Sequence, residues 1–187
     1  MGKESKSRMF QVVSQTFNCF MGTVYLIILI KAYEQAGAKV VQYFCAYNWL
    51  GLMLTHFSLG FLGNELYRQK FIRQMFSMSY GGAFTMSYIV MKYWDDRYDN
   101  FDHFFAHYIP TIVTLIHVLK LNSFTFVETM VFQLIMFVII RNPDKIYDID
   151  FYDRYYDLTL CCFWPFVIAK LIQQVIFPST NKTKNND

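Results

Sequence analysis

The sequence predicts an all-α polytopic membrane protein, a single bundle of about six transmembrane helices over residues 1–178. Composition is the first observation, since 55% of the 187 residues are hydrophobic and 20% are aromatic. The second is the placement of charge, because Lys, Arg, Asp and Glu gather in short clusters between long stretches nearly free of charge. A bilayer-spanning helix needs about 20 predominantly apolar residues in succession, so this grouping favours a membrane bundle over a soluble domain.

The predicted spans cover residues 11–30, a segment within 40–64, about 75–91, 104 to about 119, 123–140 and 158–177. The first is too long for a signal peptide and lacks a small-residue cleavage site, so we expect it to insert as a span. The second lies in a stretch without Asp, Glu, Lys or Arg, and the third is weaker and richer in Ser and Gly.

Loops and turns separate the last three spans. An acidic loop with four aspartates precedes the fourth span, a turn at residues 120–122 leads into the fifth, and an acidic, Tyr-rich loop precedes the sixth. Pro178 ends the sixth span. Residues 179–187 are polar, and we expect them to form a disordered tail.

The loop charges predict the orientation. The excess of positive charge lies at the N-terminus, in the loop from Arg68 to Arg73, at Lys120 and in the tail, whereas the Asp-rich loops lie on the other side. The positive-inside rule therefore places both termini in the cytosol. The sequon Asn181-Lys-Thr would then stay unglycosylated.

Several other classes of function are disfavoured. The net charge is +3, but the basic residues are split among short loops, so no nucleic-acid partner is expected. All four cysteines lie in apolar stretches without metal-type spacing, which indicates buried thiols. We expect membrane lipids as partners, other membrane proteins as further candidates, and no cofactor.

Ionisable side chains inside a membrane are costly and mark candidate functional sites. Within the predicted spans they are His56, His107, His117, Glu128 and Lys170. Glu128 and Lys170 lie at similar depths from the cytosolic ends of their spans, so an intramembrane ion pair that fixes helix register is expected. A path for a proton or ligand through this layer is the alternative.

His107 lies about one turn inside the opposite boundary, below the acidic loop. At such a depth an imidazole is reached by water and by lipid headgroups, which suits a general base acting on an amphipathic substrate. The alternative is an interfacial histidine that is hydrogen-bonded to the aspartates of the loop. The two alternatives stay open from the residues alone.

The histidines also suggest two kinds of metal site, a metal ion bound at one helical face and a haem bound between spans. His103 and His107 lie i, i+4 on one helical face and, with an aspartate of the loop, could hold a metal, but no second His or Cys cluster completes the site. Haem ligation between spans would use His56 with His107 or His117, although the depth of His107 matches that of His56 poorly.

Several motifs follow in the order of the spans: Trp49-Leu-Gly-Leu-Met-Leu-Thr55, Trp94 before the acidic loop, Phe104-Phe-Ala-His107-Tyr-Ile-Pro110, and a Tyr-rich loop before the last span. This layout resembles the androgen-induced-gene family of multi-pass membrane proteins. Family members hydrolyse fatty-acid esters of hydroxy fatty acids in the endoplasmic reticulum, with a threonine of the second span and a histidine of the fourth. The resemblance implies location in the endoplasmic reticulum, His107 as the catalytic base and Thr55 as the nucleophile. Tyr47 stands where the family threonine lies relative to the tryptophan, so Tyr47 and Thr55 both stay open for that place.

Residues 99–111 are also similar to the ceramide-synthase-type domain, in which a His-His pair follows an Asp-Phe run. Tyr108 stands at the second histidine, and the later Asp pair of those synthases is missing from the fifth span. This resemblance implies acyl transfer and is the weaker of the two. The sequence therefore leaves two functions: a lipid-ester hydrolase with His107 and Thr55, or a non-catalytic subunit or scaffold of a larger membrane complex.

Overall fold

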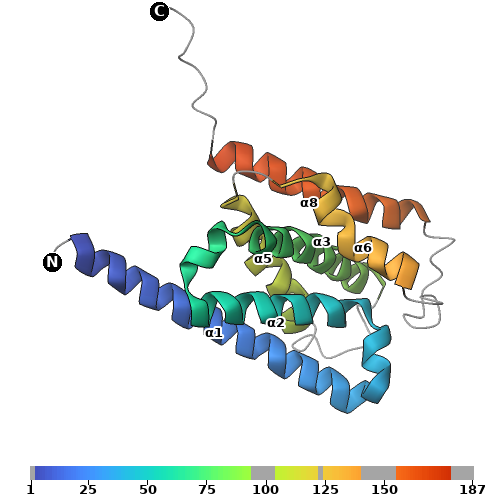
Figure 1. Cartoon of the computed structure of the whole chain (residues 1–187). Helices are drawn as coiled ribbons and strands as arrows, with labels where there is room; N and C mark the ends of the chain where they lie inside the picture. The colour runs from blue at the N-terminus through green and yellow to red at the C-terminus, as the bar shows by residue number, and fades with distance from the viewer. Residues whose placement is uncertain (1–2, 94–103, 122–123, 140–154, 178–187) are drawn as a thin grey trace, which may run out of the picture.

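The computed structural model describes residues 3–93, 104–121, 124–139 and 155–177, and this part of the chain is helical without strands (Figure 1). The α-helices are α1 (Lys3–Ala36), α2 (Phe44–Leu62), α3 (Lys70–Tyr93), α5 (Ile109–Leu119), α6 (Phe126–Ile139) and α8 (Tyr155–Ile176). The shorter helical segments are η1 (Gly37–Gln42), η2 (Asn64–Arg68) and η3 (Phe104–Tyr108). The all-α prediction is confirmed for these residues.

Successive α-helices run in opposite directions, so that the start of α1 and the end of α8 lie at the same end of the bundle (Figure 1). Helix α3 is central and contacts α2, α5, α6 and α8, whereas α1 packs mainly along α2. Each of the six predicted spans corresponds to one helical segment. The fourth span coincides with η3 and α5, while α1 extends beyond the predicted first span at both ends.

Two local signals explain helix ends. Helix α2 stops at Gly63, whose φ of +96° is open to glycine and unfavourable for other residues, and whose N–H donates to Leu59 O. Helix α6 begins with a capping box: Thr125 Oγ1 accepts from Glu128 N at 3.2 Å, and Glu128 Oε2 accepts from Thr125 N at 2.9 Å. Both signals are readable in the sequence.

Helices α3 and α6 approach at their backbones. An added Cβ at Gly81 would overlap Thr129 O, and Gln133 Nε2 donates to Thr85 Oγ1 at 3.1 Å. Ser77, Gly81 and Thr85 follow a spacing of four residues and form a small-residue face on α3. Such faces let helices pack closely in membranes, where burying apolar surface provides no driving force for association.

The bundle has a polar interior. The buried polar side chains are Asn18, Asn48, Thr55, His56, Ser77, Ser79, Thr85, Ser87, His107, Thr114, His117, Thr129 and Gln133. Cys45 is also buried and Cys19 is partly buried, and both are free thiols. These groups lie between helices among an apolar core that includes Tyr25, Leu52 and Phe76.

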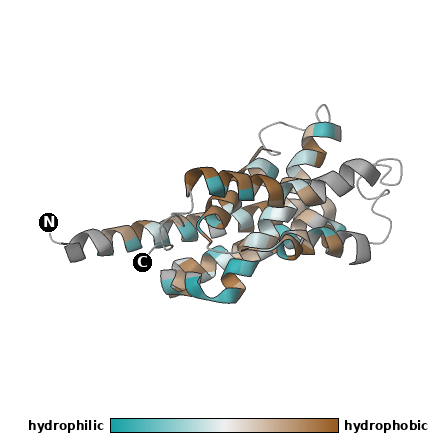
Figure 2. Ribbon diagram, turned by 90° about the horizontal axis from the view of Figure 1, so that it is seen from above, coloured by the Kyte–Doolittle hydropathy of each residue, from teal (hydrophilic) through white to brown (hydrophobic). Residues whose placement is uncertain are grey.

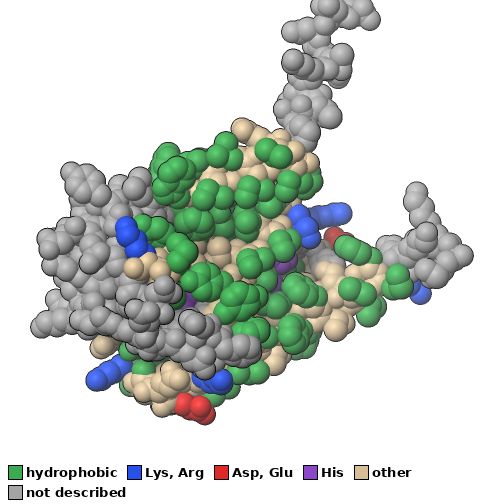
Figure 3. Space-filling model, turned by 180° about the vertical axis from the view of Figure 1, so that it is seen from behind, with side chains coloured by type: hydrophobic (Ala, Val, Ile, Leu, Met, Phe, Trp, Pro, Cys, Tyr) green, Lys and Arg blue, Asp and Glu red, His purple; other side chains and the backbone are tan. Residues whose placement is uncertain are grey.

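The exterior of the described part is largely apolar. Large hydrophobic side chains are exposed on every α-helix of the described part, for example Phe10 on α1, Phe61 on α2 and Val175 on α8. Figure 2 shows hydrophobic residues along much of the length of the helices. Figure 3 shows hydrophobic side chains over one face of the bundle, with Lys, Arg, Asp and Glu at its margins.

By length and composition, one helix of the described residues is able to cross a membrane: the segment from Arg8 to Gln42, near the N-terminus. Phe104–Leu119 and Phe163–Ile176 are apolar helices that are shorter than this criterion requires. The six-helix arrangement is therefore established for the described part, while the six membrane spans stay a prediction. The predicted disordered tail, residues 179–187, and the sequon within it lie outside the described residues.

Candidate functional site

His107 lies in the π-helical turn η3, at the start of the fourth helical segment. Its side chain is 5% exposed, and its ring contacts that of Trp49 on α2, with 5.7 Å between the ring centroids. The two motifs that carried the family resemblance, one in the second predicted span and one opening the fourth, therefore meet in space at Trp49 and His107.

Pro110 explains the Trp49 contact. An α-helical N–H at position 110 would donate to the carbonyl of Ala106, four residues earlier, but proline has no N–H. Trp49 Nε1 donates to Ala106 O instead, at 2.7 Å. The indole thus donates to a carbonyl for which Pro110 supplies no α-helical donor, and it joins α2 to the wide turn that contains His107.

Two hydroxyl groups hold the backbone of the same turn. Ser87 Oγ on α3 donates to His107 O at 2.9 Å and lies 2.7 Å from Thr111 Oγ1, which also donates to His107 O, at 3.1 Å. The sequence reasoning missed both residues. Thr111 had a signal, since it stands four residues after His107, but Ser87 was one of several serines in the weak third span.

Neither Thr55, the predicted nucleophile, nor Tyr47 donates a hydrogen bond to His107. Thr55 Oγ1 donates to Gly51 O in its own helix at 2.7 Å, and Tyr47 Oη donates to Val41 O at 2.8 Å. Thr55 stands six residues beyond Trp49, about 9 Å along α2 at 1.5 Å per residue. The structure therefore pairs His107 with Trp49 and leaves Thr55 deeper in the bundle, so the Thr55 and His107 dyad stays a prediction.

The other predicted partners of His107 cannot be placed. His103 and the aspartates of the loop before the fourth span lie outside the described residues, and so does the metal site proposed for them. Within the described ranges, no three His, Cys, Asp or Glu side chains gather as a metal-binding group.

A second histidine site lies where α1, α2, α3 and α5 meet. The rings of His56 and His117 contact edge to face with 5.4 Å between centroids, and Phe76 stacks on His117 at 3.9 Å with an interplanar angle of 9°. Tyr25 stacks on the other ring, His56, at 5.6 Å. The sequence placed these histidines in the same half of the bilayer but did not predict the contact. Because the two rings are in contact, no haem fits between them. The prediction of haem ligation by His56 with His117 is therefore wrong.

Asn18 orients His56. Asn18 Nδ2 donates to Ser14 O at 2.8 Å, so its Oδ1 faces His56 Nδ1, also at 2.8 Å. An amide oxygen only accepts, which assigns the proton to Nδ1 and leaves Nε2 with a lone pair. In the described part of the chain, His56 Nε2 has no hydrogen-bond partner. The imidazole is thus held on one side and presents an acceptor on the other, as orienting groups do for functional histidines.

Asn18→Leu is expected to destabilise the protein by about 2 kcal/mol, because it leaves the His56 Nδ1–H buried without an acceptor. Unfolding in detergent, followed by circular dichroism during an SDS titration, measures the loss. Ser58→Ala is the control, since the Ser58 hydroxyl donates only to Leu54 O of its own helix and its removal should cost less than about 0.5 kcal/mol. Equal stability of the two variants would refute the role of Asn18.

The expected ion pair of Glu128 and Lys170 is wrong. Glu128 closes the capping box of α6 and accepts from Gln74 Nε2 at 3.2 Å. Lys170 Nζ lies instead over the Phe124 ring, 4.0 Å from its centroid. A carboxylate at position N3 of a helix has backbone N–H donors closer than a lysine on another helix.

Comparison with family models, with curated proteins and with solved structures gives no match for this chain. The likeness to the androgen-induced-gene family, and the weaker one to the ceramide-synthase-type domain, therefore stay resemblances of short motifs. What the structure adds is the contact between two of those motifs, at Trp49 and His107.

Proposed function

We propose that the protein is an integral membrane protein whose six helical segments span the bilayer, with both termini in the cytosol. The observation that carries this proposal is the distribution of polarity: hydrogen-bonding side chains lie inside the bundle, and large hydrophobic side chains cover the outside. In water, Phe10, Phe20 and Phe61, each more than half exposed, would cost about 25 cal/mol for each Å² of exposed apolar surface. In hydrocarbon that cost vanishes.

The interior supports the same proposal. Gln133 bonds to Thr85 across α6 and α3, and Asn18 bonds to His56 across α1 and α2. Interhelical hydrogen bonds and small residues at close backbone contacts are the means by which helices associate in lipid. Charged side chains lie at several helix ends, as at Arg68 in the last turn of η2 and Lys92 in the last turn of α3.

Membrane fractions test the spans directly. Wild-type protein should remain in the pellet after alkaline carbonate extraction and should enter the detergent phase of Triton X-114. Release by carbonate together with partition into the aqueous phase would refute the proposal. Glycosylation tests the orientation. Asn181 should stay unglycosylated, whereas a sequon inserted after Arg97 in the acidic loop should be glycosylated.

The second candidate is hydrolysis of lipid esters at His107, with the endoplasmic reticulum as the expected membrane. It is favoured by the π-helical turn, a feature frequent at functional sites, which holds the buried His107 against Trp49. In this reaction a hydroxyl attacks the ester carbonyl while His107 accepts its proton, and the alcohol leaves; water then releases the fatty acid. Thr55 is the proposed nucleophile, and its hydroxyl must first leave Gly51 O.

That hydrogen bond of Thr55 equally favours a non-catalytic role, as a subunit or scaffold in a membrane complex. Purified wild-type protein, His107→Ala and Thr55→Ala, each assayed with fluorogenic fatty-acid esters, separate the two. A hydrolase should lose at least about 100-fold in rate in both variants, whereas the control Ser58→Ala should keep its activity. An inactive wild type, or variants with unchanged rates, would reject hydrolysis, and a stoichiometric partner in mild detergent would then identify the subunit role.

A further inference from the structure

Two lysines lie near the end of the bundle at which α5 and α8 both finish. Lys120 follows α5 and is exposed, and Lys170 lies on α8, partly buried. The ammonium of Lys170 is 4.0 Å from the centroid of the Phe124 ring and 5.7 Å from that of Phe166. Aromatic faces therefore hold this cation in place by cation–π attraction without neutralising its charge.

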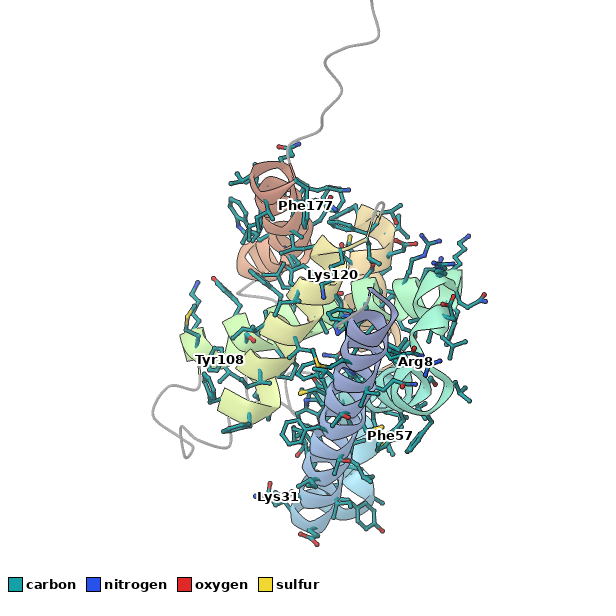
Figure 4. The ribbon with its side chains drawn as sticks, turned by 90° about the vertical axis from the view of Figure 1, so that its left-hand side faces the viewer. Arg8, Lys31, Phe57, Tyr108, Lys120 and Phe177 are labelled. Atoms are coloured by element: carbon teal, nitrogen blue, oxygen red, sulfur yellow. The ribbon has the colours of Figure 1, made fainter. Side chains whose placement is uncertain are left out.

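Gln173 connects the two positions. Its Nε2 donates to Leu121 O at 2.6 Å and lies 3.4 Å from Leu119 O, the carbonyls on either side of Lys120. Lys170 precedes Gln173 by three residues and therefore shares its face of α8. Both lysines thus lie within about one helical turn of the same contact, and Figure 4 shows Lys120 beside the Phe177 end of α8.

The two cations lack acidic partners within the described part of the chain. Glu128 belongs to the same end, but its carboxylate accepts from Thr125 N and Gln74 Nε2. The salt bridge found among the described residues, between Arg68 and Glu65, lies in η2. An anion from outside the chain would meet two positive charges here.

An apolar strip continues from Lys120 back along α5. Ile116 and Ile112 are exposed, at 49% and 50%, and they stand four and eight residues before Lys120, which places all three on one side of the helix. Positive charge at the end of a helix beside an exposed apolar face matches one ligand shape: a negatively charged headgroup with acyl chains.

We propose that Lys120 and Lys170 bind the phosphate of an anionic phospholipid, whose acyl chains lie along Ile116 and Ile112 of α5. This site rests on the proposed membrane spans and places the headgroup on the cytosolic side. Lys170, held between Phe124 and Phe166, supplies a charge in a fixed position, and Lys120 supplies an exposed one. Each basic residue near a membrane surface contributes about a fivefold gain in binding of anionic lipid.

Native mass spectrometry of the full chain in detergent tests the site, with dioleoyl phosphatidic acid and dioleoyl phosphatidylcholine as probes. Wild type should retain phosphatidic acid in preference to phosphatidylcholine. Lys170→Gln and Lys120→Gln should each weaken binding of phosphatidic acid about fivefold, and the double variant about 25-fold. Lys170→Arg keeps the charge and should retain binding, which separates loss of charge from loss of fold.

The controls lie at the opposite end of the bundle. Lys31→Gln with Lys39→Gln removes the same number of charges there and should leave binding unchanged. Equal loss in this control, no preference for phosphatidic acid, or displacement by millimolar inorganic phosphate would each overturn the lipid site. Partition into Triton X-114 is measured in parallel. Protein that enters the detergent phase but shows no lipid preference would reject the lipid site alone. Protein that stays in the aqueous phase would reject the membrane proposal as well.

Discussion

Gly81→Ala is expected to destabilise the bundle by about 3 kcal/mol, the largest effect of any single methyl group in the described part of the chain. The added Cβ would overlap Thr129 O, which belongs to the backbone of α6 and moves only if the whole helix moves. The same displacement would lengthen the bond from Gln133 Nε2 to Thr85 Oγ1. SDS titration followed by circular dichroism measures the change in the free energy of unfolding.

Glycines between α1 and α2 provide a graded control. At Gly22 a Cβ would meet the Phe57 ring at 2.6 Å, and at Gly60 it would meet Cys19 Sγ at 2.5 Å and Cys19 N at 3.0 Å. A ring turns aside more readily than a backbone does, so Gly22→Ala should cost about 1 kcal/mol and Gly60→Ala an intermediate amount. If Gly81→Ala were no worse than Gly22→Ala, the close approach of α3 and α6 would be wrong.

Trp49→Phe is expected to cost about 2 kcal/mol, because the ring stays apolar while Ala106 O loses its donor. Pro110 supplies no N–H, so the carbonyl has no α-helical donor to replace the indole. Trp164→Phe is the matched control, since that indole is 46% exposed and should cost less than about 0.5 kcal/mol. The same SDS titration measures both variants.

A double-mutant cycle isolates the cause. Pro110→Ala restores an N–H four residues after Ala106, so Trp49→Phe should cost about 1 kcal/mol less in that background than in the wild type. Additive losses would mean that the indole stabilises the bundle through packing alone, and would remove the explanation of the wide turn at His107.

The helices could be predicted from the sequence because each is bounded by local signals. Charge clusters at Arg68 and Lys92, the turn at Lys120 and the proline after α8 mark element boundaries without any knowledge of packing. The capping box of Thr125 and Glu128 is equally local, and it was overlooked because Glu128 was interpreted by its depth in the bilayer. The backbone N–H of Thr125, three residues away, binds the Glu128 carboxylate in place of the ammonium of Lys170 on another helix.

The pairing of helices could not be predicted in this way. Depth placed His56 and His117 in one half of the bilayer, but their contact depends on rotation of α2 and α5 about their axes, which only packing against Phe76 and Tyr25 decides. Likewise, the partner of His107 in the second helical segment is Trp49, although Thr55 was expected. Thr55 stands six residues after Trp49, so the two side chains differ both in their position along the axis of α2 and in the face of the helix on which they lie.

The central position of α3 has a consequence for the proposed insertion of the bundle into a membrane. This helix is rich in Ser and Gly, and nearly all of its middle, including Ser79, Tyr80 and Thr85, is covered by neighbouring helices. On the proposed topology it is the segment least able to leave the translocation channel for lipid, since Thr85 and Ser87 find their hydrogen-bond partners on α6 and on the η3–α5 segment, which follow it in the chain. On that topology we expect α3 to be retained until α5 and α6 are synthesised, so that a chain truncated after Tyr93 should fail to integrate residues 70–93 into the bilayer.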